Sequence, residues 1–252
     1  MIGVRLWKSY YGGRLVRIGR HRIVKENPYL RLAEARAMEF VAENTSIPVP
    51  RVLDIFTVDK RLNIVMEYID APSLDTVWPD MSLERRELIV TQLKDFIIQL
   101  RALPPPHPGL VHAIDESGLF DPRQQNEPFG PFSCVADFHT FIGVDYIQEH
   151  LPKENPELSD SLEKCATRSY RTTFTHGDLA PRNILVKGDK IVGIIDWECA
   201  GWYPEYWEYT SCYRSNLDCR SFWDLARDKR IMGSYSEELL VDQHLSSVVT
   251  RC

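Results

Sequence analysis

The chain has 252 residues, 44% of them hydrophobic and 26% charged, and its formal net charge is -6 at pH 7. These values are ordinary for a globular protein and exclude a disordered, collagen-like or coiled-coil chain. An acidic balance gives no general attraction to phosphate backbones, so we expect no nucleic-acid partner. The length suits two lobes that share a cleft.

The cysteines and the apolar runs indicate in which cellular compartment the protein is expected. Six cysteines are scattered without the paired spacing of a zinc site or a disulfide framework, which indicates free thiols in a reducing environment. No stretch approaches the ~20 apolar residues of a membrane span, and the N-terminal residues lack the apolar run of a secretion signal. We therefore expect a cytoplasmic protein without a membrane partner.

The first seventy residues predict a small antiparallel sheet with one helix. Residues 10–25 alternate apolar and polar side chains around a turn at Gly19, which is typical of two short strands. Apolar positions at helical spacing predict an amphipathic helix over 30–41. Residues 51–57 and 62–68 then predict a second hairpin around a polar turn.

After residue 70 the pattern becomes mainly helical. Apolar residues at helical spacing, together with start signals at the helix ends, predict helices over 82–100, 135–150 and 156–168. Between the first two, residues 104–131 predict a long irregular connection that is rich in proline and polar residues. Connections of this length often line a binding site.

The most informative segment is HGDLAPRNILVKGDKIVGIIDWE. Two β-rich runs, 184–186 and 191–195, flank a polar turn and predict a hairpin. The loop before the first strand carries Asp178 and Asn183, and Asp196 ends the second strand. The hairpin therefore brings these three side chains to one end without any assumption about distant contacts.

Those three residues supply the groups that phosphoryl transfer needs. Amide and carboxylate oxygens are ligands that Mg²⁺ prefers, so Asn183 and Asp196 are candidate metal ligands. Asp178 would orient an acceptor hydroxyl and take its proton as the catalytic base. Asp and Asn are also common in turns, but the combined pattern favours the chemical role. For His176 we expect hydrogen bonding that organises the loop.

The motifs HGDLAPRN and IIDWE resemble those of the aminoglycoside phosphotransferase and choline kinase family, which is itself similar to protein kinases. The resemblance covers about residues 15–210, and ENTSIPVP and GWYPEYWEY look like fungal members of the family. It implies the α+β class and a bilobal protein-kinase-like fold. A small antiparallel-sheet N-lobe over 1–70 would bind the nucleotide, and a mainly helical C-lobe over 71–252 would hold the catalytic loop, metal site and acceptor site.

The same resemblance implies an activity and nucleotide-binding residues. The reaction would move the γ-phosphoryl group of ATP, with Mg²⁺, to a hydroxyl of a small-molecule acceptor that the sequence does not identify. HRIVKE matches the strand with the phosphate-contacting lysine, here Lys25, and LAEARAMEF matches the helix whose glutamate, here Glu34, pairs with it. VMEYI resembles the hinge, where backbone groups of Glu67 and Ile69 would meet adenine and Met66 would stand behind it.

The sequence departs from protein kinases at two points. No GxGxxG motif precedes Lys25, and Gly12-Gly13 is the candidate for a turn that covers the phosphates. Trp197-Glu198 stands where protein kinases have Phe-Gly, which favours the small-molecule branch. A catalytically weak nucleotide-binding or scaffold protein is the alternative to an enzyme, and the sequence does not indicate an oligomeric state.

Two groups of residues keep alternative roles. Arg182 would either contact phosphate or cover the loop. The aromatic and acidic cluster after Asp196 would either face an acceptor that bears amines, or pack its rings in the core beneath a solvated acidic face. The core position is favoured for the rings. The cluster consists of Trp202, Tyr203, Glu205, Tyr206, Trp207 and Glu208.

Overall fold

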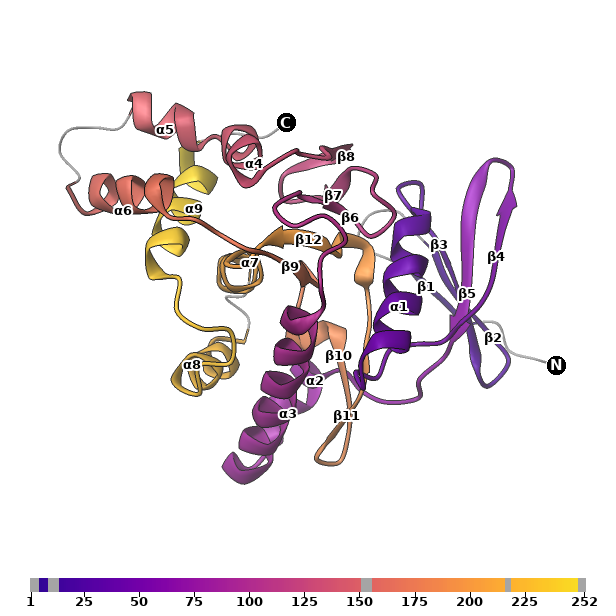
Figure 1. The fold of residues 1–252 in the computed structure, drawn as a ribbon. Helices are drawn as coiled ribbons and strands as arrows, with labels where there is room; N and C mark the ends of the chain where they lie inside the picture. Colours follow the sequence, from indigo (N-terminus) through magenta and orange to yellow (C-terminus); the bar gives the residue numbers. More distant parts are fainter. Residues whose placement is uncertain (1–4, 9–13, 151–155, 216–218, 249–252) are drawn as a thin grey trace.

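The computed structural model describes residues 5–8, 14–150, 156–215 and 219–248. The N-terminal part is an antiparallel sheet in the order β1-β2-β3-β5-β4, with one helix packed beside it (Figure 1). Its elements are β1 (Arg5–Lys8), β2 (Arg14–Ile18), β3 (Arg22–Glu26), α1 (Leu32–Asn44), β4 (Val52–Val58) and β5 (Arg61–Glu67). Both hairpins and the helix that the sequence predicts are therefore present. Gly12 and Gly13 lie outside the described residues.

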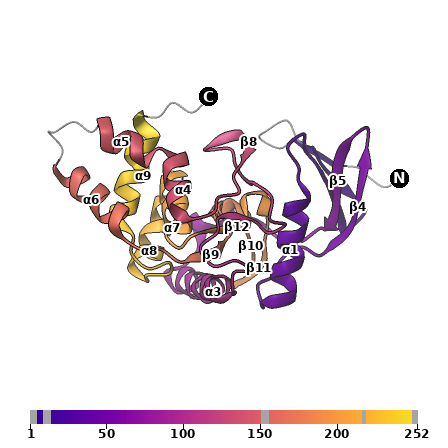
Figure 2. The same ribbon diagram turned by 45° about the horizontal axis from the view of Figure 1, so that its top comes forward.

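The other part is mainly helical and also contains two two-stranded sheets, β10-β11 and β7-β8, and a three-stranded sheet, β6-β12-β9 (Figure 2). Its helices are α2 (Leu74–Val77), α3 (Leu83–Ala102), α4 (Val135–Ile142), α5 (Val144–His150), α6 (Pro156–Thr167), α7 (Trp207–Ser215), α8 (Arg220–Asp228) and α9 (Ser236–Val248). Single 3-10 turns lie at η1 (Trp78–Asp80), η2 (Pro181–Asn183) and η3 (Trp197–Cys199). The strands are β6 (His112–Ala113), β7 (Leu119–Asp121), β8 (Gln125–Phe129), β9 (Thr172–Thr175), β10 (Ile184–Lys187), β11 (Lys190–Ile194) and β12 (Gly201–Pro204).

Two predictions for this part need correction. The helix expected over 135–150 is two helices, because Gly143 adopts φ 93° and ends α4 in the left-handed conformation. The connection expected to be irregular over 104–131 contains β6, β7 and β8. β7 and β8 pair with each other, and β6 joins β12 and β9. Strands of two to five residues are too short to show a clear alternation in the sequence.

The core explains why the aromatic cluster does not face a ligand. Trp202, Tyr203 and Trp207 are at most 1% exposed and Tyr206 is 4% exposed. Trp202 packs in the larger core with α1 and α3, and the other three pack with α4, α6 and α9. The favoured core position of these rings is confirmed, and the alternative that they face an acceptor is wrong.

The hairpin β10–β11 organises the chemistry-bearing segment. Ile184 pairs with Ile194, and the Ile195 amide donates to the Asn183 carbonyl at 3.0 Å. The end of the loop 176–183 and the residues after β11 therefore lie side by side, as the sequence predicts.

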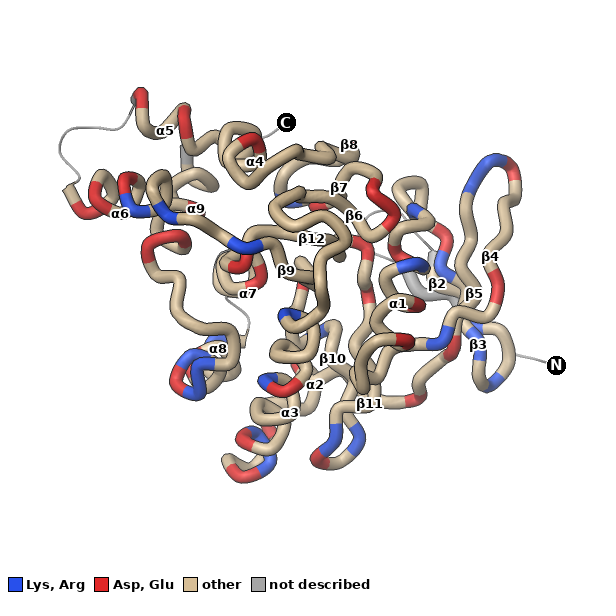
Figure 3. Tube along the Cα trace, viewed as in Figure 1, with Lys and Arg blue, Asp and Glu red and all other residues tan. Residues whose placement is uncertain are grey.

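Acidic and basic residues are mixed along several helices in the part of the chain that the structure describes. Figure 3 shows acidic and basic residues mixed along α3, α6 and α8. Within those same residues, no helix combines the length and the apolar character needed to cross a membrane.

Candidate active site

The loop between β9 and η2 is organised by a buried histidine. The Asp178 amide donates to Nδ1 of His176 at 3.2 Å, so the ring proton lies on Nε2, which donates to the Ile195 carbonyl at 3.0 Å. Burial lowers the pKa of His176, which keeps the ring neutral. His176 thus ties the loop to the strand β11 side of the hairpin, which is the organising role expected from the sequence.

Gly177 occupies a position that no other residue fits. Its φ is +81°, and a Cβ atom there would lie 2.6 Å from the Cys199 carbonyl oxygen. The amides of His176 and Gly177 both donate to the Glu208 carboxylate, at 2.7 and 3.2 Å. Burial raises the pKa of Glu208 to about 7. Helix α7 therefore begins directly beneath the loop.

Glu208 has neither of the two roles considered for the glutamates of the aromatic cluster, which were an acceptor contact and a position on a solvated face. Glu208 is 5% exposed and accepts from the loop backbone, so it faces neither solvent nor an acceptor. Glu205 lies in ion pairs with Arg101 and Arg171, at 3.4 and 3.3 Å. The helix α7 makes a further contact with the loop, because the Cys212 thiol donates to the Leu179 carbonyl at 3.2 Å.

Asp178 is held by its own loop. Nδ2 of Asn183 donates to the Asp178 carbonyl at 2.8 Å and to its Oδ2 at 2.9 Å. Nη2 of Arg182 donates to both carboxylate oxygens. Arg182 therefore covers the loop, the second of its two expected roles. Since the Asn183 amide nitrogen is engaged, its amide oxygen is the atom available to a cation.

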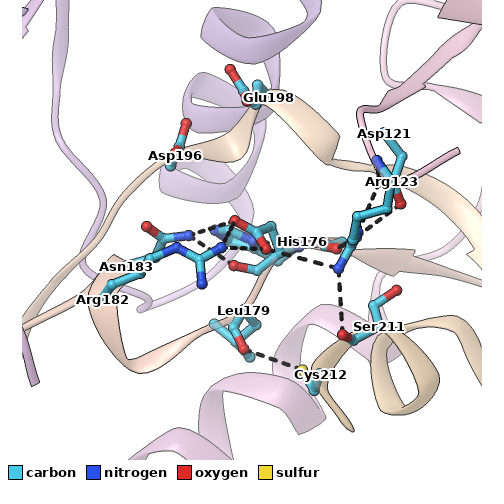
Figure 4. Close-up of polar contacts among 12 residues, drawn as sticks. Asp121, Arg123, His176, Leu179, Arg182, Asn183, Asp196, Glu198, Ser211 and Cys212 are labelled. Atoms are coloured by element: carbon cyan, nitrogen blue, oxygen red, sulfur yellow. Dashed lines mark hydrogen bonds and ion pairs between the residues drawn. The ribbon is translucent and has the colours of Figure 1, made fainter. Parts of the chain in front are cut away.

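A second guanidinium, that of Arg123, lies near the loop and comes from a residue that the sequence did not single out; Figure 4 shows it beside Asp121. Arg123 donates to both oxygens of the fully buried Asp121, at 2.8 Å each, and to the Gly177 carbonyl. Its Nη1 lies 3.8 Å from Oδ1 of Asp178. An acid and a base two residues apart at the end of the apolar run LFDPR are the sequence signal that would have found it.

The N-terminal sheet contributes an ammonium to the same region. Nζ of Lys25, on β3, lies 2.9 Å from Oε1 of Glu34 on α1, so the predicted ion pair is present. It also lies 2.6 Å from Oδ1 of Asp196 and 3.2 Å from Oε2 of Glu198. Burial alone would lower the pKa of Lys25, but the three carboxylates, Asp196 foremost, raise it well above its ordinary value. Lys25 is therefore fully charged.

Three carboxylates gather around that ammonium, and the sequence predicted only two of them. Ligand oxygens of Glu34, Asp196 and Glu198 lie within 4.8 Å of one another. Asp196 adopts φ 67°, a left-handed value that aspartate tolerates better than most residues, and its side chain is 38% exposed. Burial disfavours the charged form of Asp196, yet the Lys25 ammonium outweighs it and lowers the Asp196 pKa. These carboxylate oxygens and the Asn183 amide oxygen are of the kind that Mg²⁺ prefers as ligands.

The predicted hinge spans the end of β5 and the residues that follow it. Met66 is buried in the core, and the Glu67 amide donates to the Arg51 carbonyl at 2.9 Å. The Ile69 carbonyl accepts from the Ala71 amide at 3.0 Å. Among the described residues, the Ile69 amide has no hydrogen-bond partner, so it is a donor available to a ligand.

The family follows from a direct match. Residues 7–240 match the sequence pattern of the phosphotransferase enzyme family. The chain belongs to this family. The match includes the residues of both lobes that approach one another around Lys25 and Asp196.

Relatives of this phosphotransferase-family chain include two curated proteins. One is a homoserine kinase from Zymomonas mobilis, 24% identical over 144 residues, which are 57% of this chain and 41% of that protein. The other is an aminoglycoside 3'-phosphotransferase from Enterococcus faecalis, 28% identical over 175 residues, 67% of this chain and 60% of that protein. The matched region thus spans less than two thirds of either curated relative.

Solved structures of phosphotransferases share the fold. An aminoglycoside phosphotransferase from Streptomyces rimosus gives a TM-score of 0.59 at 18% identity, covering 98% of this chain and 93% of that one. A thermostable aminoglycoside phosphotransferase variant, solved with ADP and hygromycin B, gives 0.63 at 15% identity, covering 97% and 83%. These likenesses confirm the predicted α+β, protein-kinase-like fold.

Proposed function

We propose that the chain is a small-molecule phosphotransferase that moves the γ-phosphoryl group of ATP to an acceptor hydroxyl with Mg²⁺. One observation carries the proposal. Lys25 of the N-terminal sheet bonds directly to Asp196, which is 171 residues away, so the candidate nucleotide residues meet the candidate metal and base residues at one site. We propose lobes over 1–70 and 71–252 on either side of it.

The nucleotide and metal roles follow from the donor set. Mg²⁺, when bound, would neutralise negative charge on the phosphates. Asn183 and Asp196 would hold it through their side-chain oxygens, with Glu198 beside them. Lys25, oriented by Glu34, would contact the phosphates. The hinge at Met66, Glu67 and Ile69 would hold the adenine.

Asp178 would serve as the general base. Its carboxylate side chain is 18% exposed, so it is shielded but reachable. Asn183 holds Oδ2 and Arg182 donates to both oxygens, so Oδ1 would accept the proton of an acceptor hydroxyl once Arg182 has moved away. His176 and Glu208 would keep the loop backbone in place while this transfer occurs.

For the acceptor, we propose only a class, small compounds that carry a hydroxyl group. The curated relatives are named for homoserine and for aminoglycosides, which differ from each other. The alternative of a weak or inactive scaffold protein finds less support, because Lys25, Glu34, Asp178, Asn183 and Asp196 are all present and assembled.

Stabilisation by ATP, measured as a thermal shift with and without Mg²⁺, tests the proposal. Wild type should gain stability from ATP and Mg²⁺ together, on the order of 2.7 kcal/mol at a hundredfold excess over Kd. Asp196→Ala should lose the Mg²⁺-dependent part. Asp189→Ala, an exposed aspartate in the turn of the same hairpin, is the matched control and should behave as wild type. Absence of any Mg²⁺-dependent stabilisation in wild type would remove the proposal.

A further inference from the structure

We propose that Lys25 is the resident cation of the metal site, which it holds against free divalent ions until nucleotide phosphates draw it away. The inference rests on the proposed function, because the phosphates and the metal are those of that reaction. It concerns what the site does before a nucleotide arrives.

The geometry of the ammonium supports this role. An ammonium has three N–H donors, and Nζ of Lys25 has three carboxylate acceptors within hydrogen-bond distance, on Glu34, Asp196 and Glu198. The acceptors come from α1 and from the segment after β11. Nζ thus lies within hydrogen-bond distance of all three carboxylates at once. A divalent ion held by Asp196, with Glu198 beside it, would bind the same carboxylate groups and would compete with the ammonium for them.

The Lys25 ammonium satisfies only part of the cluster's demand for hydrogen-bond donors and positive charge. One ammonium faces three carboxyl groups, and Oε2 of Glu34 is buried without a hydrogen-bond partner. A buried carboxylate oxygen without a partner is costly, so the cluster retains a demand for positive charge. Asp196 is the member most exposed to solvent, so the cluster is open to an incoming ion on that side.

Nucleotide phosphates would resolve the competition. They offer Lys25 other oxygen acceptors of high negative charge, while Glu34 still binds the ammonium from behind. Lys25 can then leave Asp196 and Glu198 without losing all of its partners. Metal and nucleotide would therefore bind cooperatively, each favouring the arrangement that the other needs.

The test measures Mn²⁺ binding by calorimetry without any nucleotide, in wild type and in Lys25→Met. The variant should bind Mn²⁺ at least about tenfold more tightly, because both the competitor and a nearby positive charge are gone. Its melting temperature should lie below that of wild type and should recover on adding Mn²⁺. Lys187→Met, an exposed lysine on β10, is the matched control and should leave Mn²⁺ affinity unchanged.

Two further variants test the role of the Lys25 charge and the position of the bound ion. Lys25→Gln removes the charge but keeps hydrogen-bonding groups, so it serves if the methionine variant does not fold, and it should show the same gain. The double variant Lys25→Met with Glu198→Gln should lose most of that gain, which locates the ion. Equal Mn²⁺ affinity in wild type and in a folded Lys25 variant overturns the inference. That result would be distinct from failure of the proposed function, which would appear as wild type without Mg²⁺-dependent ATP stabilisation.

Discussion

A single nitrogen of Arg182, Nη2, donates to both carboxylate oxygens of Asp178, at 2.8 and 2.6 Å. The two partners differ in exposure, since the Arg182 side chain is 48% exposed and that of Asp178 is 18% exposed. Asp178 is also held by Asn183, whereas Arg182 extends toward solvent. We therefore expect the arginine to be the partner that moves when an acceptor approaches the carboxylate.

Arg182→Gln tests what that arginine does. If it orients Asp178, turnover should fall about tenfold, less than the 10²–10⁴ of a whole general base, and ATP affinity should stay within about twofold. Steady-state kinetics with an acceptor from a metabolite screen, together with ATP calorimetry, measure both quantities. A large loss of ATP affinity would instead place Arg182 on the phosphates, its other expected role.

Asp178→Asn should remove the base and leave the nucleotide site intact. We expect turnover to fall by about 10²–10⁴, with ATP affinity unchanged. Asp189→Asn, on the exposed turn between β10 and β11, is the matched control for the loss of one carboxylate. Full activity of Asp178→Asn would exclude Asp178 as the base.

Arg123→Met should destabilise the protein, because it leaves the fully buried Asp121 without its counter-ion. Breaking a buried pair in this way costs about 3–5 kcal/mol. Urea unfolding should show that adding Asp121→Asn recovers part of the loss, since the buried charge is then removed as well. Arg36→Met, which breaks the exposed pair with Glu39, should cost less than about 1 kcal/mol. Equal stability of the single and double variants at 121 and 123 would argue against a buried charge pair.

Glu208→Gln should change how stability depends on pH. Burial raises the pKa of Glu208 from 4.5 to about 7, so the folded protein binds a proton that the unfolded chain releases between these values. Glu208 therefore lowers the free energy of unfolding of wild type by up to about 1.4 kcal/mol per pH unit as pH rises from 4.5 to 7. Above pH 7 this decrease levels off.

The free energy of unfolding of wild type and of Glu208→Gln is measured in urea from pH 4.5 to 8. Glu34, whose pKa burial also raises to about 7, and Asp196, whose pKa is lowered, contribute equally to both proteins. The difference between the two curves therefore isolates Glu208. Parallel curves would contradict a buried, protonatable Glu208.

The sequence predicts those parts of the site that local structure determines. Asp178, Asn183 and Asp196 come together because a short hairpin joins them, and a hairpin shows in turn chemistry and β-rich runs. The pairing of Lys25 with Glu34 followed from resemblance to a family, and the structure shows the ion pair at 2.9 Å.

The contributions of Arg123, Glu198 and Glu208 depend on tertiary contacts. Arg123 meets Gly177 across 54 residues, and Glu208 meets His176 across 32. The sequence around the two glutamates does not distinguish a buried residue from a solvated one, and charged residues are mostly exposed. Glu208 therefore kept two alternative roles, facing an acceptor or lying on a solvated face, and Arg123 was not singled out despite the acid and base in LFDPR.

In the fold, too, the sequence predicts elements with a strong local pattern and misses elements that depend on tertiary pairing. Long elements with strong periodicity, such as α3 and the β4–β5 hairpin, agree with their predicted ranges. The strands β6, β7 and β8 do not appear in the sequence pattern, because their pairing partners lie elsewhere in the chain or across a bulge.

Helix α7 holds the loop through the amides of His176 and Gly177 and the carbonyl of Leu179. All three contacts go to backbone atoms, which are the same whatever side chain a residue carries. Exposed loop positions such as Arg182 can therefore be exchanged during evolution while the loop keeps its course. One catalytic frame can in this way be adapted to new acceptors by substitutions that leave its shape unchanged.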